Sequence, residues 1–76
     1  MDEIQKIEEQ DALYRALMKL SVTDRRLIVL RLGWEGEPPH TFREMAEIMG
    51  ISENQSRDWY LTAIDRLRVV TEEMNK

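Results

Sequence analysis

The hydrophobic positions of this chain recur at helical spacing in four stretches, which are separated by short polar or glycine-containing segments. The cleanest apolar stripe stands at positions i, i+3, i+4 and i+7 of one segment: Phe42, Met45, Ala46 and Met49. This spacing puts the four side chains on one narrow face of an α-helix. The pattern as a whole predicts a single all-α domain, residues 1–76, with four helices.

The first predicted helix runs from about Asp2 to Leu20. Its apolar residues fall mostly at helical spacing: Ile4, Ile7, Leu13, Ala16, Leu17 and Leu20. The first turns are rich in acidic residues, which suits the positive end of the helix dipole. The same turns contain few large apolar side chains, so we expect them to fray.

The second predicted helix begins after Ser21, because a hydroxyl at that position caps the backbone and Asp24 follows at the third helical position. We expect it to run to about Leu32 and to end at Gly33, since glycine readily adopts the left-handed conformation of a helix end. The loop that follows contains three residues that disfavour helix: Gly36, Pro38 and Pro39.

The most informative pattern is a pair of helix starts separated by a glycine. Thr41 is followed three positions later by Glu44, and Ser52 is followed at the same spacing by Gln55. Each pair is a capping box, and Gly50 between them can end the first helix. Two helices joined by so short a turn form a helix-turn-helix, here residues 41–72, and the second helix of that unit commonly reads DNA.

The fourth predicted helix extends from about Glu53 to Glu72. We expect it to bury an apolar stripe: Trp59, Ala63, Ile64, Leu67 and Val70. Its opposite face near the start is polar: Asn54, Arg57, Asp58 and Thr62. One helix would therefore pack against the core along one side and present a polar reading surface along the other.

Composition and charge narrow the possible functions. The net charge of −4 counts against strong duplex binding, although residues 1–20 alone contribute −2 of it. There is no cysteine and a single histidine, His40, so the chain offers no zinc site. We find no glycine-rich phosphate loop or nucleophile elbow, and expect no enzyme and no cofactor. No membrane-length apolar run or signal peptide is apparent, which makes a cytoplasmic location without membrane attachment the expectation.

The stretch from Leu20 to Arg68 resembles region four of the bacterial sigma factors. The resemblance is carried by four blocks in order: residues 20–26, residues 29–33, residues 41–52 and residues 63–68. The third block, Thr41 to Ser52, is similar to the threonine-leucine-glutamate-glutamate helix and turn of that family. The length of the loop between Gly33 and Thr41 is also similar. The resemblance therefore implies a sigma region-four-like helix-turn-helix domain.

In that family the domain binds double-stranded promoter DNA and docks on the flap tip of the RNA polymerase β subunit. The resemblance implies four residues that face the DNA backbone: Arg31, Thr41, Phe42 and Glu44. It also implies four residues at the base-facing start of the recognition helix, about 53–72: Asn54, Gln55, Arg57 and Asp58. Apolar residues of the first two helices would support or form the polymerase-docking surface: Leu17, Leu27 and Leu30.

The chain departs from that family mainly at the start of the recognition helix. A run of arginines is usual there, whereas residues 53–58 keep only Arg57 as a base. Val29 and Asp65 also stand where basic residues are common. The scaffold is therefore retained better than the reading surface, and we expect no preference for the standard upstream promoter element.

Several residues have two interpretations. Arg57 can pair with a guanine edge or form a surface ion pair with Glu53, and its position favours DNA. Asn54 can read adenine or remain solvated, while Gln55 is favoured as a cap. Asp58 can accept from cytosine, remain solvated or face a protein partner. The aromatic Trp59 is expected to pack inside, and Trp34 either covers the core or anchors a partner.

Two functions of different classes follow from the sequence. The first is a sequence-specific DNA-binding module of a sigma-like transcription factor. The second is an acidic protein-interaction module on the same scaffold, which binds RNA polymerase, an anti-sigma protein or another copy of itself. A phage packaging or regulatory protein that reuses a helix-turn-helix is a third, weaker alternative, because it depends on fold-level analogy alone.

Overall fold

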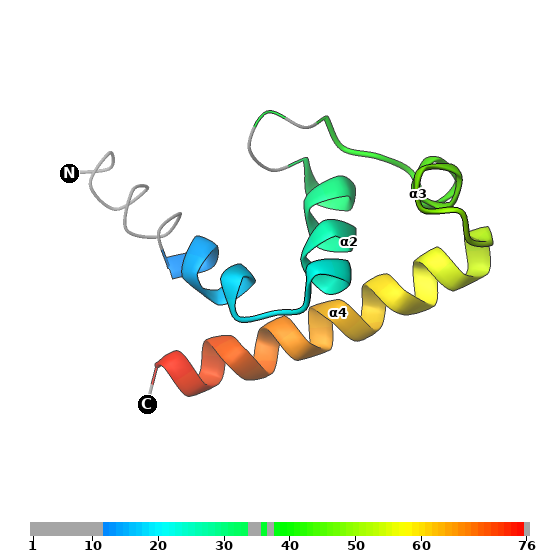
Figure 1. Ribbon diagram of the computed structural model, residues 1–76. Coiled ribbons are helices and arrows are strands. Elements are labelled where there is room, and N and C mark those ends of the chain that lie inside the picture. The colour runs from blue at the N-terminus through cyan, green and yellow to red at the C-terminus, as the bar shows by residue number, and fades with distance from the viewer. Residues whose placement is uncertain (1–11, 34–35, 37, 76) are drawn as a thin grey trace.

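The computed structural model describes residues 12–33, 36 and 38–75. These residues form four helical segments and no strand: residues 12–18, α2 (Val22–Leu32), α3 (Phe42–Met49) and α4 (Glu53–Met74) (Figure 1). The predicted all-α class is confirmed. The predicted helix start at Asp2 and the two interpretations of Trp34 fall outside the described residues.

The longest helix, α4, organises the domain. Its 22 residues correspond to a rod of about 33 Å. Figure 1 shows α2 standing across the middle of α4, with α3 beside the start of α4 and the helical segment 12–18 over its second half. Both α2 and α3 pack against α4. The start of α4 is therefore held by α3, and the remainder is held by α2 and the segment before it.

The core consists of two adjacent apolar clusters. The first lies between segment 12–20, α2 and α4, and its buried members are Leu17, Leu20, Ile28 and Ala63. The second lies between α2 and α3, and its buried members are Leu27, Leu30 and Met45. Tyr60 of α4 packs against both clusters and thereby joins them. A chain of this size depends on such sharing, since small domains bury little surface per residue.

The predicted starts of α2, α3 and α4 and the predicted ends of α2 and α3 are confirmed. The Ser21 hydroxyl accepts from the Asp24 amide at 3.2 Å, and α2 ends at Gly33, whose φ is 75°. Both predicted capping boxes are present, and Gly50 ends α3 with a φ of 69°. These ends were predictable because a cap depends only on neighbouring residues.

Two helix ends differ from prediction by two residues. The first helix ends at Met18 rather than Leu20, because the amides of Lys19 and Leu20 bond to carbonyls three residues back in a tight turn, each at 3.1 Å. At the other terminus, α4 continues past Glu72 to Met74. Differences of this size are usual where a final turn frays or tightens.

The predicted burial of Trp59 is wrong, because its exposed fraction is 41%. The buried side of α4 runs through Ser56, Tyr60, Ala63 and Leu67, of which Ser56 and Ala63 are fully enclosed. Successive residues of a helix turn by about 100°, which places Trp59 on the flank of that side. This side begins at the polar Ser56, so the apolar residues alone did not show that Trp59 lies beside it.

Candidate nucleic-acid interface

The turn between α3 and α4 is fixed by the backbone of Gly50. The amides of Gly50 and Ile51 both bond to the carbonyl of Ala46, the second at 3.0 Å. A Cβ added at Gly50 would meet nothing within 4 Å, so conformation rather than space requires glycine there. The turn therefore sets the direction in which α4 leaves α3.

A buried hydroxyl joins the first turns of α3 and α4. Ser56 has no exposed surface, and its Oγ lies 2.8 Å from the carbonyl oxygen of Phe42 and 2.8 Å from that of Glu53. A residue this small lets the two helices approach closely while its hydroxyl remains bonded. Sequence reasoning missed Ser56. The available signal was its position, four residues before Tyr60 and seven before Ala63 on the buried side.

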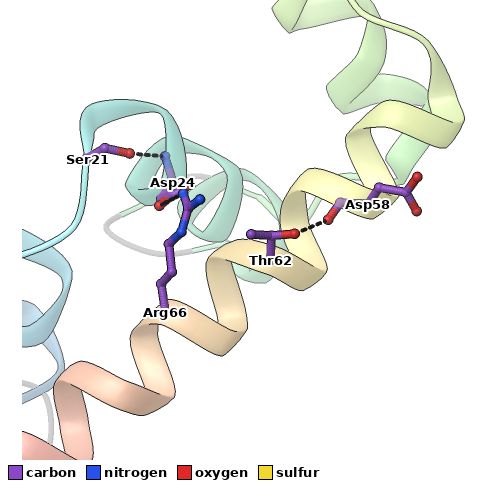
Figure 2. Close-up of polar contacts among 5 residues, drawn as sticks. All are labelled: Ser21, Asp24, Asp58, Thr62 and Arg66. Atoms are coloured by element: carbon purple, nitrogen blue, oxygen red, sulfur yellow. Dashed lines mark hydrogen bonds and ion pairs between the residues drawn. The ribbon is translucent and has the colours of Figure 1, made fainter.

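The outer side of the start of α4 is open to solvent. Asn54, Arg57 and Asp58 are exposed there, as predicted, and the structure brings them onto one surface. Leu61, which is 54% exposed, continues this surface one turn further and was missed. Thr62 does not belong to it, because Thr62 lines a cavity between α2 and α4. Its hydroxyl donates to the Asp58 carbonyl at 3.0 Å, while the Asp58 carboxylate points away (Figure 2).

Gln55 serves the α4 cap, in agreement with the favoured interpretation. The Ser52 amide donates to its side-chain oxygen at 3.0 Å, and the Gln55 amide donates to the Ser52 hydroxyl at 3.0 Å. This oxygen is therefore occupied within the chain, which weakens Gln55 as a reader of adenine.

The α3 cap involves two other predicted site residues. The Glu44 carboxylate accepts from the Thr41 amide at 2.9 Å, and the Glu44 amide donates to the Thr41 hydroxyl at 3.1 Å. The bond from the Thr41 amide, then the Thr41 hydroxyl and the nearby His40, hold the pKa of Glu44 below its ordinary value of 4.5. Glu44 thus remains ionised and engaged in the cap.

Two arginines from different helices meet at one aromatic ring. The guanidinium carbon of Arg31 in α2 lies 4.3 Å from the centre of the Phe42 ring, and that of Arg57 in α4 lies 5.9 Å from the same centre. Arg31 also donates to the His40 carbonyl at 3.0 Å. Arg57 is turned toward Phe42, and the described ion pairs do not include the alternative contact with Glu53.

The other side of α4 carries an ion pair with α2. Arg66 Nη1 lies 2.8 Å from Asp24 Oδ2, and the exposed fractions of the two side chains are 61% and 9% (Figure 2). The pair lies at a cavity of about 260 Å³, whose lining includes Ser21, Leu27, Trp59 and Thr62. This side is separate from the Asn54 surface because it lies on the flank of α4 that faces α2.

The apolar residues implied for polymerase docking are interior residues. Leu17, Leu27 and Leu30 are 2%, 0% and 3% exposed, so they can support a docking surface but cannot form one.

Among the described residues, no group of metal-ligating side chains is close enough to hold an ion. None of the described helices has the length and apolar character that crossing a bilayer requires.

Comparison of the chain with protein-family models, curated proteins and solved structures gave no match.

Proposed function

We propose that this domain is a DNA-binding module of a sigma region-four-like transcription factor, in which α3 and α4 act as a helix-turn-helix. The observation that supports the proposal best is the open outer surface at the start of α4, held in place by α3. Asn54, Arg57, Asp58 and Leu61 share that surface. The first turns of a recognition helix are the part that meets base edges in the major groove.

The chemistry of this surface suits a mixed set of contacts. Asn54 can pair with both edge groups of adenine, Asp58 can accept from the cytosine amino group, and Leu61 can meet a thymine methyl. Arg31 and Arg57 provide positive charge beside them for the phosphates. Because the chain is acidic overall, we expect a modest duplex affinity. The phosphate contacts release counterions on binding, so this affinity should decline as the salt concentration rises.

The test is a duplex titration across a salt series, with random-sequence duplex and with duplexes enriched by selection. An Arg57→Glu substitution should abolish binding. The matched control is Arg68→Glu, which makes the same charge change on the same helix at an exposed residue whose ion pair with Asp65 is also exposed. Equal losses in the two variants would mean that net charge alone governs binding, and the proposed docking of α4 would be wrong.

A protein-interaction function is the second candidate, and exposed apolar side chains on the α2 side of the domain favour it. Trp59, Val69 and Val22 are 41%, 52% and 71% exposed, and Trp59 borders the cavity beside Asp24. In this alternative the scaffold binds RNA polymerase, an anti-sigma protein or itself. Recovery of polymerase from nuclease-treated bacterial extract by the parent, and its loss on Trp59→Ala, would support it. Unchanged recovery by that variant would contradict this surface.

A further inference from the structure

We infer that Arg31, Phe42 and Arg57 form a phosphate clamp, in which the Phe42 ring positions two guanidiniums for neighbouring phosphodiesters of one DNA strand. This inference builds on the proposed DNA-binding function and sharpens it. It gives Arg57 a defined place on the DNA backbone in place of the guanine contact expected from the sequence, and leaves base reading to Asn54, Asp58 and Leu61.

The platform of the clamp is rigid. Phe42 is the first residue of α3, and its ring packs against the second core cluster and tilts against Tyr60, with 5.7 Å between ring centres. Its own carbonyl accepts the buried Ser56 hydroxyl of α4. The core therefore holds the ring, and the junction of α3 with α4 holds its backbone, so the ring cannot turn away without disturbing the core packing.

The two guanidiniums converge on that platform from separate helices. Both carbon centres lie within 5.9 Å of one ring centre, so the two side chains are neighbours in space despite their separation in sequence. A guanidinium at this distance from an aromatic face is attracted by the ring quadrupole. The contact already restricts each long side chain, so less conformational entropy is lost when it binds an anion.

Both arginines keep the capacity to bind an anion. Arg31 uses one N–H for the His40 carbonyl, and a guanidinium has five donors. The ion pairs of the described residues, Asp24–Arg66 and Asp65–Arg68, do not involve either member of the clamp. Neighbouring cations repel each other, and an anion that binds both of them relieves that repulsion.

A phosphodiester strand fits this arrangement. Each strand of B-DNA presents a phosphate about every 3.4 Å along the helix axis, so two arginines on one ring can address nearby phosphates of the same strand. Contacts of this kind set the register of the protein without reading sequence. The clamp therefore predicts that loss of Arg57 weakens binding to every sequence by a similar factor.

The clamp can be tested without DNA by titrating the full chain with sodium tripolyphosphate and following the arginine Nε–Hε signals by NMR. The Arg31 and Arg57 signals should move together and saturate at one concentration, while the Arg68 signal should move much less. Movement of neither clamp signal, or saturation at clearly different concentrations, would overturn the clamp whether or not the protein binds duplex.

The role of the ring is tested by Phe42→Leu, which keeps an apolar side chain in the core but removes the π face. We expect tripolyphosphate and duplex affinity to decrease about two- to five-fold, the range of an exposed cation–π contact. Phe42→Tyr keeps the ring and should bind like the parent, so it separates the platform from packing. Equal binding by the leucine and tyrosine variants, both folded by circular dichroism, would overturn the positioning role.

Duplex titration separates the clamp from the proposed function. Arg57→Gln should lower affinity by the same factor on random and selected duplexes, and reduce the salt slope by about one. A loss confined to selected duplexes would make Arg57 a base reader, which overturns the clamp and leaves the DNA-binding function intact. A different result is joint movement of the Arg31 and Arg57 signals with tripolyphosphate in an unsubstituted protein that binds no duplex. That result would overturn the DNA-binding function and retain the anion site.

Discussion

The junctions of α4 with α3 and with α2 are built from different chemistry. Its start meets α3 through the fully buried Met45 and Ser56 and through a hydroxyl that bonds to main-chain carbonyls. Its middle meets α2 through Ala63 in the core and through the Asp24–Arg66 ion pair at the rim. The first junction is closed to solvent at its polar contact, whereas the second leaves Arg66 largely solvated and borders a cavity.

This difference shows how one helix can be positioned accurately at one end and merely packed along the rest. A bond to the main chain fixes the relative placement of two backbones, since it cannot be altered by a change of rotamer in the acceptor. An ion pair between two side chains tolerates small shifts, because the long arginine side chain can follow them. The junction of α3 with α4, which positions α4 more accurately, lies beside the surface that we propose reads DNA.

The largest loss of stability is expected when a buried side chain at the junction of α3 with α4 is shortened. Met45→Ala should destabilise the domain by about 2–5 kcal/mol, because it removes a fully buried α3 side chain from the cluster that α2 and Tyr60 of α4 share. Met18→Ala makes the same change at a residue that is 52% exposed, and should change the free energy of unfolding by less than about 0.5 kcal/mol. Urea titrations of both variants measure this. Similar losses at the two positions would contradict the assigned core.

Substitution of the two partners of the Asp24–Arg66 ion pair, at the junction of α2 with α4, should change the free energy of unfolding by different amounts. Arg66→Gln leaves the nearly buried Asp24 carboxylate without its partner, and should cost about 1–3 kcal/mol. Asp24→Asn removes the charge of the buried partner and leaves a solvated arginine, so it should cost less. Chemical denaturation of the two variants gives the comparison. A larger loss for Asp24→Asn would mean that Asp24 acts chiefly on the α2 dipole rather than through Arg66.

Ser56→Ala tests whether the buried hydroxyl bond holds α3 and α4 together. The loss of its hydroxyl should cost about 0.5–1.5 kcal/mol and lower hydrogen-exchange protection in α3 more than in the second half of α4. The control is Thr62→Ala, which removes an exposed hydroxyl that also bonds to the α4 backbone and introduces a better helix former. An equal change of α3 protection in both variants would show that the Ser56 bond does not hold the helices together.

The smallest effect concerns the acid range. Because the pKa of Glu44 is lowered in the folded state, its charge contributes stability above about pH 4.5, and this contribution is lost as the pH falls through the folded pKa. Glu44→Gln keeps the capping contacts without a titrating group. The parent should therefore lose more stability than the variant on acidification, measured by thermal melts across the acid range. Parallel melting curves would contradict this assignment.

The local parts of the fold could be predicted from the sequence, and the parts that depend on packing could not. Ser21, Gly50 and both capping boxes were located to the residue, since each depends on neighbours a few positions away. Trp59 was placed inside because hydrophobicity alone suggested it. Its exposure depends on which side of α4 meets α2 and α3, and Tyr60, not Trp59, packs against both core clusters there.

The candidate site shows the same limit. Asn54, Arg57 and Asp58 were predicted on one face because they share a helix, and the structure places them there. The meeting of Arg31 with Arg57 was not predictable in this way, since it joins α2 to α4 across a ring from α3. Only a tertiary contact shows that Phe42 faces the two guanidiniums while it remains part of the core.

The absence of glycine and proline from α4 has a mechanical consequence. Helices bend sharply at such residues or at inserted turns, and α4 has neither residue type along its 22 positions. A partner that grips the end of α4 near Met74 and tilts it would therefore swing the opposite end through the same angle. If α4 reads DNA as proposed, the orientation of Asn54 relative to the duplex is adjusted from the far end of the domain, without any rearrangement at the turn before α4.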